Sequence, residues 1–481
     1  MFPDFGSKAL EEAEKNGASY ADIRISEIIK EGLTVKNGEP EVVNLLQTKG
    51  FGVRVIVEGA WGFAGSIDIN DTEIEETVKK AISIARASSL LKKADAALIP
   101  EKAERDKHLS SFRKDPFKVP VEEKLEVLVQ AGRILKEQSP LIKAAYTYYR
   151  GFNEKKLFMS TEGAKISQEI TWCGGGLAAI GVKNGDMQKR SYPSSFGGNN
   201  ATKGYEFFES FELVDHSKQI GKELLAMFDA KKCPSGELDL VLTGDQLALQ
   251  VHESCGHPTE LDRALGTEAD YAGTSFLTPE KLGDFRYGSE DVDIVADATV
   301  PHGLGTFGYD DEGTKAKKVY LVREGLFVGY QSSRETASEL DLGESSGGMR
   351  GDSPLALPLI RMTNINLLQG DWKADEIIED TKDGVLMMTN RSWSIDDKRI
   401  NFQFGTEIGW RIKNGSKEEI VKNPTYMGVT PQFWGACNAV SKDDWMMWGV
   451  PNCGKGVPSQ VMYVGHGCGT ARFHKVRVGL M

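Results

Sequence analysis

The chain opens with an amphipathic pattern over residues 7–16, which predicts a short helix. Apolar and polar residues then alternate in four runs separated by Gly- and Asn-containing turns, as is typical of half-buried strands. These runs cover residues 20–29, 32–38, 41–47 and 50–66. We therefore expect an antiparallel sheet in the first part of the chain.

Apolar residues at helical spacing predict three longer helices. They are expected over residues 71–91, 119–138 and 214–232. The first begins at Asp71-Thr72-x-x-Glu75, which resembles a capping box. Residues 94–119 are polar and charged, so we expect a loop there, and residues 141–212 have the pattern of a strand meander.

A polar segment with proline and glycine, KKCPSGE, predicts a boundary between two domains, residues 1–232 and 233–481. The second part opens with an apolar strand and a helix, and continues beyond Ala272 as short strands and glycine turns. Because helices and strands are segregated, we expect the α+β class. The N-terminal α/β domain would combine an antiparallel sheet with helices. The C-terminal domain would be mostly β and barrel-like.

The helix at the start of the second part carries His252-Glu253-x-x-x-His257. Five residues of a continuous α-helix separate two side chains by about 140°, so the histidines could not share one metal ion. Gly256 can terminate a helix, and a residue before Pro258 avoids the α region. We therefore expect the helix to end between the histidines, so that His257 swings back toward His252. The alternative is two partly buried histidines without a metal.

A catalytic zinc site needs a third protein ligand and an open position. Cys453, in a glycine-rich turn, is one candidate, and Cys468 and His466 are rivals. Cys255 lies inside the motif, where it would compete with both neighbours. Other polar candidates, for which we expect structural roles, are His302, Asp310, Asp311, Glu312 and Arg361. Glu253, next to a ligand, could act as general base.

Composition and charge argue against several classes of protein. The formal net charge of −12 and the lack of a basic stripe argue against nucleic-acid binding. No window approaches eighteen uncharged apolar residues, so we expect no membrane span. Six cysteines in 481 residues are too sparse for a disulfide scaffold, and no signal peptide is evident. We expect a cytoplasmic protein with reduced thiols.

Several ordered segments resemble the TldD/PmbA family, once labelled modulators of DNA gyrase and now regarded as metalloproteases. They are HESCGHPTELDRALGTEADYAGTSF, YDDEGTKAKKVYLVREGLFVGY, PLIRMTNINLLQG and CGKG. Because the histidine motif is present, the chain resembles the metal-bearing TldD-type subunit. After the cysteine, family members resemble CGK-x-GQ-x-x-P, whereas this chain has CGKGVPSQ.

The resemblance implies zinc ligands at His252, His257 and Cys453, with Glu253 as the catalytic glutamate. It also implies peptides or unfolded segments as substrates, and a homodimer or a heterodimer with a metal-free relative. The alternative is a non-catalytic regulatory or binding subunit. A thiol-based redox protein is a third hypothesis, weakened by the lack of a CxxC pair.

Overall fold

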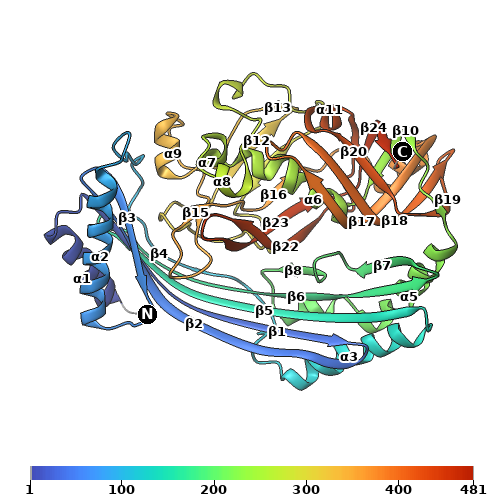
Figure 1. Cartoon of the computed structure of the whole chain (residues 1–481), viewed down its shortest axis with the longest axis horizontal. Coiled ribbons are helices and arrows are strands. Elements are labelled where there is room, and N and C mark those ends of the chain that lie inside the picture. Colours follow the sequence, from blue (N-terminus) through green and yellow to red (C-terminus); the bar gives the residue numbers. More distant parts are fainter. Residues whose placement is uncertain (1–2, 480–481) are drawn as a thin grey trace.

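The computed structural model describes residues 3–479, without the side chain of residue 272. Long strands form a curved sheet along one side of the molecule, in the order β3-β2-β1-β5-β6-β4, with β7 and β8 also paired to β6 (Figure 1). Its strands are β1 Tyr20–Lys36, β2 Glu39–Val57, β3 Ala60–Ser66, β4 Arg105–Leu109, β5 Ile142–Ser160, β6 Lys165–Lys183, β7 Asp186–Tyr192 and β8 Asn199–Ala201.

Helices cover the two ends of this sheet and enclose separate cores (Figure 1). At one end α1 and α2 pack on the sheet, and at the other end α3 and α5 do so. The helices are α1 Pro3–Lys15, α2 Asp71–Ser89, α3 Val121–Glu137, α4 Tyr205–Glu209 and α5 Leu213–Asp229. The predicted helices are confirmed because their apolar residues face the sheet at helical spacing.

Three local predictions are wrong. The first four strand runs form only three strands, because Gly32 and residues 48–50 continue the pairing of β1 with β2, and the chain turns at Asn37-Gly38 and again at Glu58-Gly59. All four turn residues have positive φ, which suits tight hairpins. The predicted loop 94–119 contains β4, which pairs in parallel with β6. The capping box predicted at Asp71-Thr72-x-x-Glu75 is also wrong. The cap of helix α2 is the Asn70 side chain, which accepts a hydrogen bond from the backbone N–H of Glu73.

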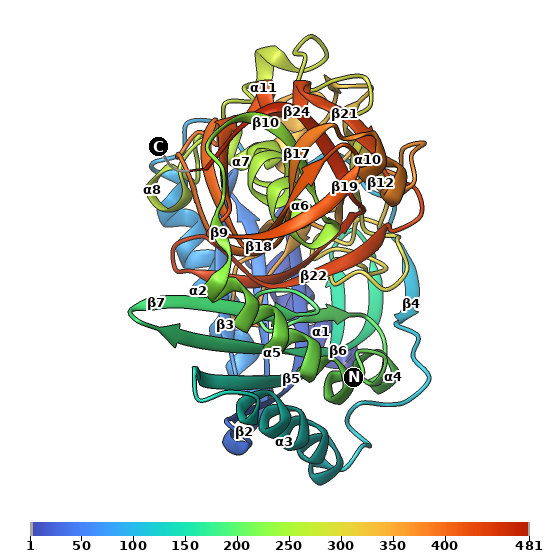
Figure 2. The same cartoon turned by 90° about the vertical axis from the view of Figure 1, so that its right-hand side faces the viewer.

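The second half of the chain forms a closed barrel, which confirms the expected α+β class with a barrel-like C-terminal region. The barrel order is β17-β10-β24-β20-β18, and β18 pairs back to β17. These strands are β10 Gly236–Leu242, β17 Asp383–Ile395, β18 Asn401–Lys413, β20 Thr425–Val429 and β24 Ala471–Val478. Helix α6 (Gly244–Val251) lies among them in Figure 2, and all eight of its residues are buried.

Shorter elements surround the barrel. The strands are β9 Lys231–Lys232, β11 Ile294–Asp297, β12 Lys318–Arg323, β13 Leu326–Phe327, β14 Met349–Arg350, β15 Leu359–Ile360, β16 Ile365–Leu367, β19 Ser416–Lys422, β21 Cys437–Val440, β22 Met446–Lys455 and β23 Gln460–Cys468. The helices are α7 Leu261–Ala264, α8 Ala269–Ala272, η3 Pro279–Lys281, α9 Arg334–Glu339, α10 Ala374–Asp380 and α11 Thr430–Gly435. None of the helices within residues 3–479 combines the length and apolarity needed to cross a membrane.

The acidic run Asp310, Asp311 and Glu312 joins the two halves. All three side chains are buried, and Asp311 forms ion pairs with Arg24 of β1 (3.0 Å) and Lys156 of β5 (2.6 Å). Burial raises the pKa of Asp311, but the two cations outweigh it and bring the pKa down to about 2. The run therefore lies in the interior of the fold and links the second half of the chain to the curved sheet through buried ion pairs.

Candidate metal centre

The motif lies where helix α6 changes its hydrogen-bonding pattern. Residues His252–Gly256 form a π-helical turn, and the backbone N–H of His257 donates to the carbonyl of His252. A π-turn closes five residues onward, so two residues five apart lie on the same side of the helix. The sequence spacing that is wrong for an α-helix is therefore right for this turn.

The expectation that the chain leaves the helical region at Gly256 is wrong. Gly256 and His257 both keep right-handed helical angles, and a 3₁₀ turn follows over His257–Thr259. Pro258 lies in the first turn of this 3₁₀ segment, where its missing N–H leaves no helical hydrogen bond broken. A change of helix type, and not a helix end, brings the two histidines together.

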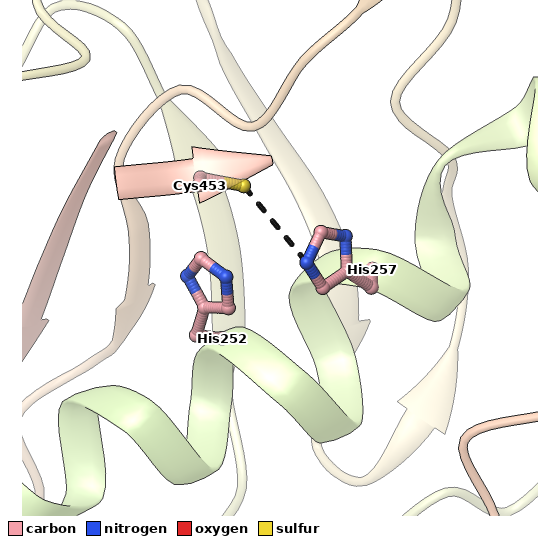
Figure 3. A group of neighbouring side chains, drawn as sticks. All are labelled: His252, His257 and Cys453. Carbon is pink, nitrogen blue, oxygen red and sulfur yellow. Dashed lines mark hydrogen bonds between the residues drawn. The ribbon is translucent and has the colours of Figure 1, made fainter. Parts of the chain in front are cut away.

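His252, His257 and Cys453 point toward one another in Figure 3. Their ligand atoms all lie within 4.8 Å of each other, and Cys453 Sγ is 3.9 Å from His257 Nε2. The imidazole rings are perpendicular, with centroids 4.8 Å apart. Among the described residues, these three side chains are the one group of His, Cys, Asp and Glu ligand atoms close enough together to hold a metal ion.

Cys453 reaches the histidines from β22, a strand that lies across from the helical turn carrying them (Figure 3). The register of β22 with β23 shifts between Val450 and Cys453, and such irregularities re-aim side chains near sites. Arg361 is fully buried and donates to the carbonyl oxygens of Cys453 and Gln460, so it holds this strand in place. Arg361 thus has a positioning contact with the cluster.

Hydrogen bonds fix the tautomers of both histidines. His466 Nδ1 lies 3.1 Å from the carbonyl of Ile365, which can only accept, so Nδ1 donates and Nε2 is left as an acceptor. His252 Nδ1 lies 2.8 Å from this Nε2 and donates to it. His257 Nδ1 lies 3.0 Å from a carboxylate oxygen of Glu260. Each motif histidine therefore directs its Nε2 at the cluster, where a metal ion can replace the proton that this nitrogen carries when the ring is charged.

The charges of the cluster favour a thiolate. Burial raises the pKa of Cys453, but the nearby charges of Arg361 and the two histidines outweigh it and hold the pKa well below its usual range. Burial lowers the pKa of His252, whereas the Cys453 sulfur raises it, and the net shift is upward. One sulfur and two imidazole nitrogens form a donor set that suits zinc.

Glu253 lies beside the cluster and not within it. Its side chain is buried and accepts a hydrogen bond from Arg399, whose backbone has a positive φ of 67°. Burial raises the pKa of Glu253, but His252, His257 and Arg399 lower it, and the net shift is downward. A cavity of about 480 Å³ is lined by Glu253 and Arg399 together with His252, His257 and Cys453.

The rival candidates lie elsewhere or have other contacts. Cys255 and Cys468 are buried in the barrel core, and burial raises the pKa of Cys468 to about 12. His466 supports His252 and is not one of the clustered ligand atoms. His302 lies 3.3 Å from the carbonyl of Thr202, away from the cluster.

Two supporting residues were missed by sequence reasoning. Glu260 follows His257 by three residues, so its helical spacing was a usable signal. Arg399 lies 146 residues from Glu253, in the loop between β17 and β18, and no local pattern marks it.

Family models match most of the chain. They are described as PmbA/TldA metallopeptidase domain 1 over residues 21–85, the central domain over residues 114–228 and the C-terminal domain over residues 235–480. The chain belongs to the TldD/PmbA family. The resemblance drawn from the sequence motifs is thereby confirmed, and the C-terminal family domain includes the whole histidine–cysteine cluster.

Curated relatives in this family carry metalloprotease names. A metalloprotease of Methanocaldococcus jannaschii is 30% identical, covering 95% of this chain and 98% of the relative. A zinc metalloprotease TldD homologue of Saccharolobus solfataricus is 24% identical, covering 98% and 99%. The crystal structure of TldE from Thermococcus kodakarensis shares the fold with a TM-score of 0.73 at 15% identity, covering 99% and 100%.

Proposed function

We propose that this chain is a zinc-dependent metallopeptidase that cleaves peptides or unfolded segments. His252 Nε2, His257 Nε2 and Cys453 Sγ would hold the ion. In a tetrahedral site, a nitrogen at 2.1 Å and a sulfur at 2.3 Å from zinc are about 3.6 Å apart. The 3.9 Å between Cys453 Sγ and His257 Nε2 is close to this value and is the observation that carries the proposal.

When bound, zinc would supply a Lewis acid that polarises a peptide carbonyl and activates water. Glu253 follows a ligand in the sequence and lines the same cavity, so it would take a proton from the attacking water and return it to the leaving amine. Arg399 holds the Glu253 carboxylate in place and also lines the cavity, where its charge can stabilise the negative charge that develops on the carbonyl oxygen.

Zinc content and peptide cleavage test this proposal together. Purified protein is stripped with a chelator, reloaded and analysed for metal, and its activity is followed on a disordered peptide. Wild type should bind one zinc per chain and cleave. Glu253→Gln should keep the zinc and lose cleavage by a factor of at least about 100, the usual contribution of a general base.

Two cysteine variants provide matched controls. Cys453→Ser should lose zinc, whereas Cys468→Ser should keep it, although both side chains are buried in the same core. Full activity of Glu253→Gln would refute the mechanism. Zinc retention by Cys453→Ser would refute the ligand set. A wild-type protein that refuses zinc would favour the regulatory-subunit alternative.

The proposal includes an assembly of two subunits, either two copies of this chain or this chain and a metal-free relative. Residues of β2 between Glu39 and Lys49 are exposed, and they include Val42, Val43, Leu45 and Leu46 with exposed fractions of 42–67%. An apolar patch of this kind is typical of a protein interface. Light scattering on the purified chain, alone and with the relative, tests both forms.

We also propose a cytoplasmic location, because all six cysteines are free and a reducing compartment preserves thiols. Cell fractionation tests it, and recovery of the protein outside the cytoplasm would refute it.

A further inference from the structure

A second cavity of about 580 Å³ lies beside the metal centre. Tyr271 lines both cavities, and its hydroxyl is 2.9 Å from Ser459 Oγ on the wall of the second one. The chain passes from Cys453 in the first cavity to Gly456 in the second within three residues, a Cα span of at most about 11 Å. The two cavities are therefore neighbours.

The second cavity combines apolar walls with negative charge. Three carboxylates line it, Glu268, Asp270 and Asp352, and no Lys, Arg or His is among the described residues of its lining. The apolar walls come from Phe63, Leu355, Leu357, Leu359 and Val457. A positively charged group with a long apolar stem would complement both properties.

Glu268 is the lining residue that most directly indicates a missing ligand. Its side chain is only 9% exposed, and its Oε2 has no hydrogen-bond partner among the described residues. Lys455, which lies nearby, is already paired with Glu260 and Asp262. A buried carboxylate without a donor is costly, and a bound cation would remove that cost.

We propose that this cavity is a substrate subsite for a lysine or arginine side chain. The inference rests on the proposed peptidase function and gives its substrate class. An extended peptide advances by about 3.3 Å per residue, so the basic residue would lie within about three positions of the cleaved bond. The apolar walls would contact the methylene groups, and Glu268 with Asp270 and Asp352 would pair with the charged end.

Peptide binding to a full-length, zinc-loaded Glu253→Gln protein tests the subsite without cleavage. Labelled disordered peptides are compared in pairs that carry either lysine or norleucine at one position, scanned over three residues on each side of the central bond. At one or more positions, the lysine peptide should bind about tenfold tighter, as expected for one charge-assisted contact.

Neutral variants identify the cavity as the cause. Glu268→Gln, added to the Glu253→Gln protein, should reduce the lysine preference to less than about twofold and leave norleucine binding unchanged. Asp270→Asn is a second variant on an exposed residue, which guards against a folding defect, and it should also lower the preference. Glu122→Gln, an exposed carboxylate on α3, should have no effect.

The outcomes separate the subsite from the peptidase function. Equal binding of the two peptides at every position, or a preference that Glu268→Gln and Asp270→Asn leave intact, overturns the subsite. If wild-type protein cleaves neither peptide but the lysine preference depends on Glu268, the subsite stands and the peptidase proposal falls.

Discussion

Replacing His466 with phenylalanine tests whether a residue outside the ligand set controls the metal centre. His466 is fully buried between the Ile365 carbonyl and His252, and its Nε2 is the acceptor that keeps the proton of His252 on Nδ1. Phenylalanine fills a similar volume but accepts no hydrogen bond. In this variant His252 is free to rotate or to change tautomer.

The expected loss follows from one buried hydrogen bond. Leaving the His252 Nδ1–H without its partner costs about 1–3 kcal/mol, which corresponds to about 5- to 150-fold in zinc affinity. Loss of a residue that orients a metal ligand typically costs about 10- to 100-fold, which lies within that range. We therefore expect His466→Phe to bind zinc about 10- to 100-fold more weakly than wild type.

Competition with a chelator of known affinity measures the effect, and the Co²⁺ absorption spectrum shows whether the ligand geometry has changed. Cys468→Ser, two residues along the same strand, is the matched control and should retain wild-type affinity. Equal zinc affinity in His466→Phe and wild type would refute the role given to this hydrogen bond. An equal loss in Cys468→Ser would show that the strand, and not the imidazole, is responsible.

Other predictions concern the supporting residues and the assembly. Glu260→Gln, which weakens the acceptor for His257, should lower zinc affinity by about tenfold in the same chelator competition. Asp311→Asn should lower the free energy of unfolding in urea by about 3 kcal/mol, with exposed Asp68→Asn as control, and an unchanged value would contradict a fastening role. The folded-state pKa of Asp311 is depressed to about 2, so its charged form contributes about 2.5 kcal/mol to the free energy of unfolding above pH 4, and this contribution is lost as the pH falls toward 2. The free energy of unfolding should therefore fall less steeply with decreasing pH in Asp311→Asn than in wild type. Leu45→Lys with Leu46→Lys should halve the mass measured by light scattering, and a wild type that is already monomeric would show that this surface is not a homodimer interface.

The regular elements were largely predictable from local pattern. Helices α2, α3 and α5 bury one face against a sheet, so their apolar spacing was visible in the sequence. Strand ends were less accurate. Glycine at position 32 and Lys49-Gly50 read as breaks, but pairing of β1 with β2 on one side and β5 on the other keeps the backbone extended there.

By itself, the sequence determined the α+β class, the family and the chemical types gathered in one motif, because these depend on residue identity and spacing along the chain. It could not reveal the π-turn, since a change of helix type depends on how Pro258 and the surrounding core accommodate the backbone. It also left Cys453 and Cys468 as rivals. The tertiary structure shows which thiol lies beside the histidines: a register shift in β22 brings Cys453 to them, whereas Cys468 lies outside that group, although both thiols are buried in the same core. Contacts across more than a hundred residues, such as Arg399 with Glu253, were decided by the closure of the barrel, which brings distant loops to one cavity.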